Sequence, residues 1–372
     1  MKASRPDRDR RVLHAGLALM LAGLAGCGDA DPPLVIAEER ASPAEPRLEA
    51  EMTESILAHY RRQRTAHPER PIPRFNQPKT LACPAAMLRV PELPEQLARG
   101  LFARPGEYPA TLRFANATRQ DDREPDLRGL SIRVEDVPGA SGVDGTPGRQ
   151  DFLLNSHPVL FAGTPEDFHA FVEAVTGERM WWYFLTHPRS LWIAWRARGQ
   201  PNSLLNMTFW STTPYRYGKG EAVKYAVRPC DDDTSPAEAP AGDGDPDFLR
   251  HAMAERLSEG SACLALQVQF QQDPERMPIE DASVAWDETR SPFHTVARLT
   301  LPAQRVEDPA ALSRCEGMAF NPWNGHPDHR PLGGINRVRR GIYEAVGALR
   351  TEHHASLVSP GEAGRHPTGG SP

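Results

Sequence analysis

Residues 336–350 read NRVRRGIYEAVGALR and form the most informative segment of the chain. Their spacing predicts a helix, and at 3.6 residues per turn Arg339, Tyr343 and Arg350 fall on one stripe of it. Two guanidiniums that flank a phenol can hold that phenol as its phenolate. The alternative is an exposed arginine-rich helix with one amphipathic tyrosine, in which these three residues share no role.

Three further segments stand in order before this helix. They are LRFAN at 112–116, DLRGLSIRV at 126–134 and DFLLNSHPVLF at 151–161. Together with RRGIY at 339–343, they resemble four motifs of the haem catalases: the Arg-Phe-Ser segment, the Asp-Pro-Arg-Gly-Phe segment, the distal Asn-x-Pro-x-Phe-Phe run and the proximal Arg-x-x-x-Tyr helix. The similar segments keep the order they have in that family and extend over residues 70–350.

The resemblance implies an α+β fold: a catalase-like antiparallel β-barrel with surrounding helices and a C-terminal proximal haem helix. It implies that Tyr343 is the axial ligand of the haem iron and that Arg339 lowers the pKa of this phenol. It also implies that the propionates of haem b contact Arg74, Arg113 and Arg350. Apolar periodicity independently predicts strands at 81–90, 108–117, 130–137, 151–154, 204–213, 222–227, 262–270 and 294–301, and helices at 51–64, 165–175, 181–198 (broken by a proline), 248–257 and 336–350.

The distal side of the expected haem pocket departs from the family pattern. Residues 74–79 read RFNQPK, so Gln77 stands where catalases place a histidine, and Ala115 replaces the serine that bonds it. The distal amide is Asn155 if the alignment is anchored on asparagine, whereas Ser156 takes that place if it is anchored on the following proline. A glutamine amide orients a ligand by hydrogen bonds, but it cannot carry a proton between the oxygens of a peroxide.

Loss of a general base typically lowers a rate by about a hundredfold to ten-thousandfold, so rapid catalatic turnover is not expected. His67 and His157 are two other imidazoles that could enter the pocket instead. Two functions are therefore open. The first is a haem-dependent peroxidase or weak catalase that uses Gln77 and Asn155 on hydrogen peroxide or organic hydroperoxides in oxidative stress. The second is a non-catalytic haem-binding or sensing lipoprotein.

The start of the chain is typical of a secretory signal. Five basic residues precede the apolar residues 12–24, and LAGC at 24–27 resembles the lipobox of bacterial lipoproteins, whose cysteine is lipidated. We therefore expect a secreted lipoprotein on the periplasmic side. Gly28 is not the aspartate that retains such lipoproteins at the inner membrane, so we expect an anchor in the outer membrane. The expected segments are a signal peptide at 1–27 ending in the lipobox Cys27, a flexible tether at 28–50, the haem domain at 51–352 with a surface loop at 231–247, and a disordered tail at 353–372.

Composition restricts the partners of the chain. Its 372 residues carry 43 Lys plus Arg and 49 Asp plus Glu, a formal charge of −6, without the basic stripe that nucleic acid requires. Up to two disulfides, in any of three pairings, could join Cys83, Cys230, Cys263 and Cys315. The run WWYF at 181–184 is interpreted as a core aromatic cluster rather than as the lining of a substrate channel. A homo-oligomer is left open.

Overall fold

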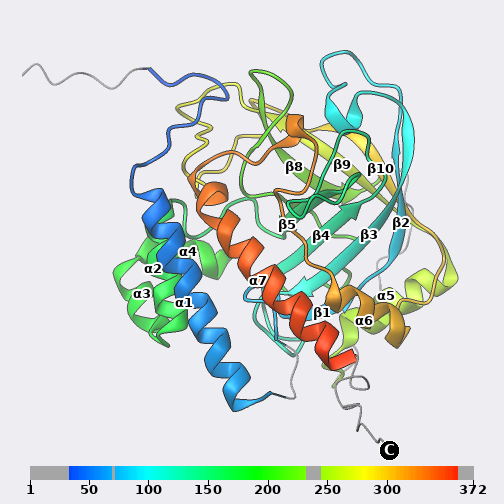
Figure 1. Ribbon diagram of the computed structural model, residues 1–372. Coiled ribbons are helices and arrows are strands. Elements are labelled where there is room, and N and C mark those ends of the chain that lie inside the picture. The colour runs from blue at the N-terminus through cyan, green and yellow to red at the C-terminus, as the bar shows by residue number, and fades with distance from the viewer. Residues whose placement is uncertain (1–32, 69–71, 232–243, 359–372) are drawn as a thin grey trace, which may run out of the picture. The chain divides into compact units, whose positions relative to one another are not determined.

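The computed structural model describes residues 33–68, 72–231 and 244–358 of the chain. Antiparallel strands form a β-barrel with helices around it (Figure 1). In chain order the elements are α1 (Glu45–Ala66), β1 (Lys79–Ala82), β2 (Ala85–Val90), η1 (Gly100–Phe102), β3 (Gly106–Asn116), β4 (Arg128–Val134), β5 (Gln150–Asn155), α2 (Pro165–Thr176), α3 (Met180–Thr186), α4 (Pro188–Arg196), β6 (Phe209–Trp210), β7 (Tyr215–Arg216), β8 (Ala222–Pro229), α5 (Phe248–Glu259), β9 (Ala262–Phe270), β10 (His294–Leu301), α6 (Pro309–Gly317), η2 (Pro327–His329) and α7 (Gly334–Val358).

The long strand β3 closes the barrel because it pairs along both of its edges. One edge pairs with β2 and, further along, with β1, whereas the other edge pairs with β4. The closed circuit runs β3-β2-β10-β9-β8-β6-β5-β4 and returns to β3, while β7 adds to β8. The predicted α+β fold with a closed antiparallel barrel is therefore confirmed.

Alternate residues of β3 and β4 face opposite sides of the barrel wall, as the period of two in a strand requires. Leu112 lies opposite Ile132, and Phe114 lies opposite Leu130. These four side chains have no exposed surface and belong to the barrel core. Arg113 lies between them in sequence and therefore points the other way, yet it is only 1% exposed. A charged side chain is thus buried between the barrel wall and the surrounding layer.

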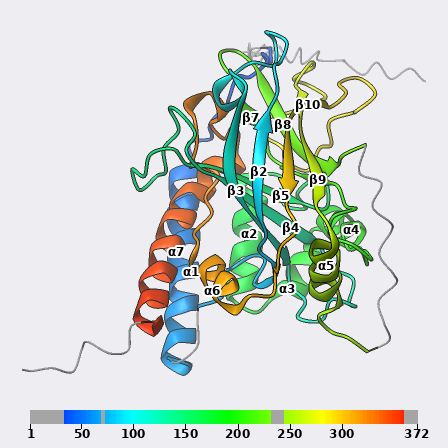
Figure 2. The same ribbon diagram turned by 90° about the vertical axis from the view of Figure 1, so that its right-hand side faces the viewer.

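Helices α1 and α7 run side by side and form a second core (Figures 1 and 2). Leu48, Met52 and Ile56 follow one another at helical spacing on α1 and pack in one cluster with Val338 and Ile342 of α7. The two helices therefore bury their apolar stripes mainly against each other and α2. This arrangement holds the residues of the predicted proximal helix at a fixed place beside the barrel.

The predicted flexible tether at 28–50 is wrong for its described part. The backbone N–H of Ala37 donates to Gln271 Oε1 at 2.7 Å, and α1 already begins at Glu45. The physical reason is Arg337 on α7, whose guanidinium binds Glu39 at 2.7 Å and Glu45 at 2.7 Å. Burial opposes the ionisation of both carboxylates. Contacts with Arg330, and to a smaller extent Arg337, nevertheless hold the pKa of Glu39 below its ordinary value, and Arg337 does the same for Glu45.

The structure also bears on the predicted boundaries of the tail and of the surface loop. The predicted tail at 353–372 starts too early, because α7 continues to Val358. Most of the predicted loop at 231–247 lies outside the described residues, but its end is fixed to β1, where Asp247 lies 2.9 Å from Lys79 Nζ. The signal peptide and Cys27 also lie outside the described residues. No helix in the described ranges is both long and apolar enough to cross a membrane.

Two disulfides select one of the three pairings that the sequence allows. Cys83 pairs with Cys315, and Cys230 pairs with Cys263. The second bridge joins Cys230, the residue after β8, to Cys263 of the neighbouring strand β9. The first is the more informative of the two, because it joins the connection between β1 and β2 to α6, across 232 residues of sequence.

Candidate functional site

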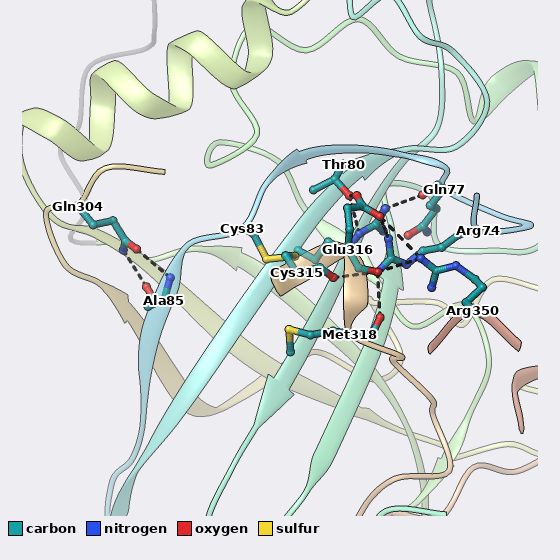
Figure 3. Close-up of a disulfide and its surroundings, with 11 residues drawn as sticks. Arg74, Gln77, Thr80, Cys83, Ala85, Gln304, Cys315, Glu316, Met318 and Arg350 are labelled. Atoms are coloured by element: carbon teal, nitrogen blue, oxygen red, sulfur yellow. Dashed lines mark hydrogen bonds and ion pairs between the residues drawn. A yellow bond between two sulfur atoms is a disulfide. The ribbon is translucent and has the colours of Figure 1, made fainter. Parts of the chain in front are cut away.

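Three arginines meet at one carboxylate beside the barrel wall (Figure 3). Arg74 Nη1 lies 2.5 Å from Glu316 Oε2, and Arg350 Nη2 lies 3.7 Å from the same oxygen. Arg113 reaches the carboxylate through a hydroxyl: its Nε donates to Thr80 Oγ1 at 2.9 Å, and Thr80 donates to Glu316 Oε1. We call the three arginines and Glu316 the arginine cluster. The structure therefore brings together all three residues predicted to contact propionates.

Backbone carbonyls and the first disulfide hold the cluster in place. Arg74 Nη2 donates to the carbonyl of Met318 at 2.9 Å and to that of Cys315 at 3.0 Å. Arg350 donates to the carbonyl of Glu316 at 2.9 Å. Because Cys315 is bonded to Cys83, the end of α6 is fixed next to β1, as Figure 3 shows.

The positive charge of the cluster exceeds its negative charge. Burial, and then the charge of Arg74, lowers the pKa of Arg113 to about 9 and that of Arg350 to about 10. Burial opposes the ionisation of Glu316, but Arg74, Thr80 and Arg113 outweigh it and lower its pKa. Three guanidiniums against one carboxylate leave two positive charges without a partner inside the cluster. Such an excess favours an anionic ligand.

Sequence reasoning did not select Glu316, or Tyr60, which lies close to the same arginines. Burial raises the pKa of Tyr60, while the charges of Arg350 and Arg74 oppose that rise. Its phenol oxygen is buried without a hydrogen-bond partner in the described part of the chain. A free hydroxyl beside excess positive charge is a donor available to an anion. No motif marks either residue, because contacts distant in sequence bring both to the site.

Tyr343 and Arg339 lie one turn apart on α7, as predicted. The Arg339 Cζ is 5.8 Å from the centroid of the Tyr343 ring. Arg339 Nη2 also donates to Asn336 Oδ1 at 2.8 Å, and the same oxygen accepts a hydrogen bond from Thr213 at 3.2 Å. The Arg339 side chain is therefore fixed between its own helix and the loop before β7. The phenol oxygen of Tyr343 makes no hydrogen bond to any residue that the structure describes.

Gln77 and Asn155 form a hydrogen-bonded pair of amides, since Gln77 Nε2 donates to Asn155 Oδ1 at 2.8 Å. Gly129 makes room for this pair, because a Cβ at that position would lie 2.1 Å from the Gln77 amide. Ser156 is engaged elsewhere: its Oγ accepts from the backbone N–H of Arg128 at 2.9 Å. Of Asn155 and Ser156, the two candidates for the distal position next to Gln77, Asn155 is thus the one that contacts it.

The two histidines considered for the distal side have different surroundings. His67 is exposed and lies at the C-terminal end of α1. His157 is half-buried after β5, and burial, with a smaller effect of the Arg196 charge, lowers its pKa below the ordinary value of 6.5. His157 is therefore neutral at pH 7 and retains the ability to accept a proton.

The donor set fits haem in its chemistry. Tyr343 with Arg339 offers a phenol oxygen next to a cation, which suits a ferric iron. The arginine cluster offers excess positive charge for two carboxylates, and it is connected to the other groups: Arg350 lies on the same helix as Tyr343, and Arg113 Nη2 donates to the Gln77 carbonyl at 2.7 Å. Only Glu316 stands apart from this fit, because its carboxylate already makes contacts that a propionate would make.

Comparison with known proteins agrees with the fold. The chain is 27% identical over 214 residues to a catalase-related peroxidase of Mycolicibacterium paratuberculosis, covering 54% of this chain and 64% of that protein. It is 23% identical over 309 residues to an allene oxide synthase-lipoxygenase protein of Plexaura homomalla, covering 73% of this chain and 27% of that protein. A crystal structure of a fungal catalase matches with a TM-score of 0.60 at 18% identity, covering 80% of this chain and 63% of that one.

The chain spans less than two thirds of the length of each of these proteins. No model of a known protein family matches it. The strand topology, the structural match and the sequence similarity nevertheless agree with one another. The chain therefore has a catalase-like fold and is similar in sequence to a catalase-related peroxidase.

Proposed function

We propose that this protein binds haem b and acts on hydrogen peroxide or organic hydroperoxides as a peroxidase or weak catalase, with a role in oxidative stress. The observation that carries the proposal is the arginine cluster, in which three largely buried guanidiniums surround one carboxylate. A ligand with two carboxylates would balance the two remaining positive charges, and haem b carries two propionates. The similarity to a protein named catalase-related peroxidase supports peroxide as the substrate class.

Each residue of the site has a role in this proposal. Tyr343 would bind the iron through its phenolate oxygen, and Arg339 would favour that charged form. The arginine cluster would hold the propionates. When bound, haem supplies a redox-active iron that peroxide can oxidise. Gln77 and Asn155 would orient a peroxide by hydrogen bonds, but neither amide can take up its proton.

A haem titration of the purified protein tests the proposal. We expect the parent protein to develop a Soret band that saturates at one haem per chain. Tyr343→Phe should abolish the spectrum of a tyrosinate-bound ferric haem, because phenylalanine has no oxygen to bind iron. Tyr108→Phe, a matched change on the barrel strand β3, should leave the spectrum unchanged. A parent protein without any Soret band after addition of haem would overturn haem binding altogether.

A second function, haem binding or sensing without catalysis, is favoured by the amide pair itself. Gln77 donates to Asn155, so this pair has no group that can exchange a proton near pH 7. The peroxide consumption of the haem-loaded protein, with and without an electron donor, separates the two functions. Consumption that requires the donor identifies a peroxidase. No consumption in either assay identifies a haem carrier or sensor.

The substitution Gln77→His tests the distal role of this residue. An imidazole restores a proton acceptor, so we expect oxygen evolution from peroxide to rise by about a hundredfold or more at unchanged haem content. Gln77→Leu is the control, since it removes the amide without adding a base, and its oxygen evolution should not rise. Equal rates for all three proteins would place Gln77 away from the reacting peroxide.

The proposal extends to location. The LAGC segment at 24–27 supports lipidation of Cys27 and an outer-membrane anchor on the periplasmic side, and the two disulfides suit an oxidising compartment. Cys27→Ser should remove the lipid mass from the N-terminal peptide and let a high-salt wash release the protein from the membrane fraction. A membrane fraction that is unchanged, together with an unlipidated parent peptide, would contradict the anchor.

A further inference from the structure

Helices α3 and α4 expose an apolar surface that the haem site does not use. The sequence predicted that the aromatic run at 181–184 would lie in a core, but of this run only Tyr183 is fully buried, and Trp181 is 68% exposed. The following helix repeats the pattern, because Trp195 is 69% exposed. We call the exposed apolar residues of the two helices the tryptophan face: Trp181, Trp182, Leu185, Leu191, Trp192 and Trp195.

The two helices are fixed by their other side. Tyr183 and Ile193 are buried. The Tyr183 ring lies 5.8 Å from the ring of Phe171 on α2, and its hydroxyl donates to Ser190 of α4 at 3.3 Å. The three helices α2, α3 and α4 lie together in both ribbon views (Figures 1 and 2). The tryptophan face is thus the outer surface of two helices whose opposite side packs against the domain.

The segment that forms this surface carries charge of one sign. Residues 179–200 contain four arginines and no aspartate or glutamate, in a chain whose formal charge is −6. All four arginines are exposed, and among the described residues none of them takes part in an ion pair: they are Arg179, Arg189, Arg196 and Arg198. The Cζ of one, Arg196, lies 4.8 Å from the centre of the Trp192 ring. The tryptophan face is therefore bordered by unneutralised positive charge.

We propose that the tryptophan face docks on the surface of a bilayer that contains anionic lipids. Four of its six residues are tryptophan, whose amphipathic ring is favoured at the level of lipid headgroups. Apolar residues bordered by arginine are typical of helices that lie in the membrane interface. Each arginine close to an anionic bilayer raises the affinity of the protein for that bilayer by about fivefold.

A second copy of the chain fits this surface less well. A symmetric dimer through the tryptophan face would place the same four arginines of both copies against each other. An anionic lipid surface supplies the complementary charge over the whole face. This docking is separate from haem binding and from a lipid at Cys27, so its test requires neither.

The test uses residues 28–372, which contain every residue that the structure describes and lack the apolar stretch 12–24. The protein is floated with vesicles of phosphatidylcholine, with and without phosphatidylglycerol, at low and high salt. We expect binding to the vesicles that contain phosphatidylglycerol and a loss of binding at high salt. Trp181→Ser with Trp195→Ser should lower the affinity for the vesicles that contain phosphatidylglycerol by at least about tenfold.

Two further double variants distinguish the contribution of the arginines to vesicle binding from that of the tryptophans. Arg189→Gln with Arg198→Gln should weaken binding to the anionic vesicles by about tenfold or more and flatten its salt dependence. The control Arg47→Gln with Met87→Ser removes an exposed arginine and an exposed apolar side chain from other elements, and it should bind like the parent. All of these side chains are exposed, so circular dichroism should show the fold unchanged.

Two results would overturn the proposal. One is a parent protein that does not float with anionic vesicles, or whose binding the tryptophan and arginine variants leave unchanged. The other is a concentration-dependent dimer, measured by light scattering, that is lost in the tryptophan variant while vesicle binding is absent. That result would assign the tryptophan face to a second copy of the chain.

Discussion

At the scale of single residues, Glu316 has the strongest influence on the candidate site. One of its carboxylate oxygens contacts Arg74 at 2.5 Å, and the other accepts from Thr80. Glu316 therefore neutralises part of the positive charge of the arginine cluster, which would be costly to bury without a counterion. It also stands where a carboxylate of a bound ligand would make its contacts. If the proposed function holds, Glu316 would stabilise the protein without haem and would compete with the propionates of haem.

We predict that Glu316→Gln lowers the free energy of unfolding at pH 7 by about 1–2 kcal/mol. This value is below that of a fully buried pair because the Glu316 side chain is 39% exposed. Its pKa in the folded protein lies below the ordinary 4.5, so its contribution is complete above that pH and is lost as the pH falls through the folded value. Urea unfolding at a series of pH values should show the difference between the two proteins shrinking below about pH 4.5.

The same substitution should tighten haem binding, since a propionate no longer competes with the Glu316 carboxylate. The Soret titration described above measures this change. An affinity for haem that falls in Glu316→Gln would mean that Glu316 helps to form the haem site instead of occupying it.

Sequence patterns predicted part of this site for clear physical reasons. Helical spacing places Tyr343, Arg339 and Arg350 on one helix, and a strand motif places Arg113 on the barrel wall. The choice between Asn155 and Ser156 required the structure, because it depends on which neighbour each side chain contacts. The roles of these residues toward haem stay predictions. Glu316 could not be selected, since its approach to the arginines depends on a disulfide whose pairing was open.

At the scale of elements, the predicted helix at 51–64 was found but begins six residues earlier, at Glu45. Its first turns are rich in charged residues and therefore looked like part of a solvated linker. Arg337 on α7 supplies the opposite charges that order them, and it also binds Glu280 at 2.8 Å. Contacts between elements far apart in sequence, which periodicity cannot detect, thus set where this helix begins.

The aromatic run at 181–184 shows a second limit of sequence patterns. Both sides of α3 carry large apolar residues, so periodicity alone does not distinguish the buried side from the exposed one. The neighbouring helices decide, and they bury Tyr183 while they leave Trp181 and Trp182 exposed. The break of the segment into two helices at Pro188 was predicted correctly, because proline is favoured at the first position of a helix.

We predict that the two disulfides contribute unequally to stability. In the loop-entropy description, a bridge across 232 residues constrains the unfolded chain by about 1.7 kcal/mol more than one across 33 residues. Cys83→Ala with Cys315→Ala should therefore lose more free energy of unfolding than Cys230→Ala with Cys263→Ala. Chemical denaturation of both double variants under oxidising conditions measures the difference. Equal losses would show that local contacts, and not loop length, determine what each bridge contributes.

At the scale of the whole molecule, the described domain has two large apolar cores. One fills the barrel, and the other lies between α1, α2 and α7. The arginine cluster lies between the cores, with Arg113 on the barrel wall and Arg350 on α7, so charged groups that need their partners stand between them. This arrangement suggests that the helical layer can open while the barrel stays folded, as cooperative units in other proteins do.

We predict that Val338→Ala opens the helical layer selectively. Val338 on α7 and Val268 on β9 are both fully buried, so truncating either one should cost about 2 kcal/mol. In hydrogen exchange, Val338→Ala should accelerate exchange in α1 and α7 and leave β9 and β10 protected. Val268→Ala, the matched change in the barrel, should accelerate exchange in the strands. Acceleration of all elements by both substitutions would show that the domain unfolds as one unit.

The pairing of β2 with β10 has a consequence for the newly made chain. Leu88 lies opposite Leu299, so the barrel cannot close until residues from near both ends of the domain exist. At about 5–20 residues per second, ribosomes make the second of these residues on the order of 10–40 s after the first. Throughout that time β2 has an unpaired edge, to which a strand of another chain can add. The first strands of this barrel are therefore the part of the nascent protein that chaperones most need to shield.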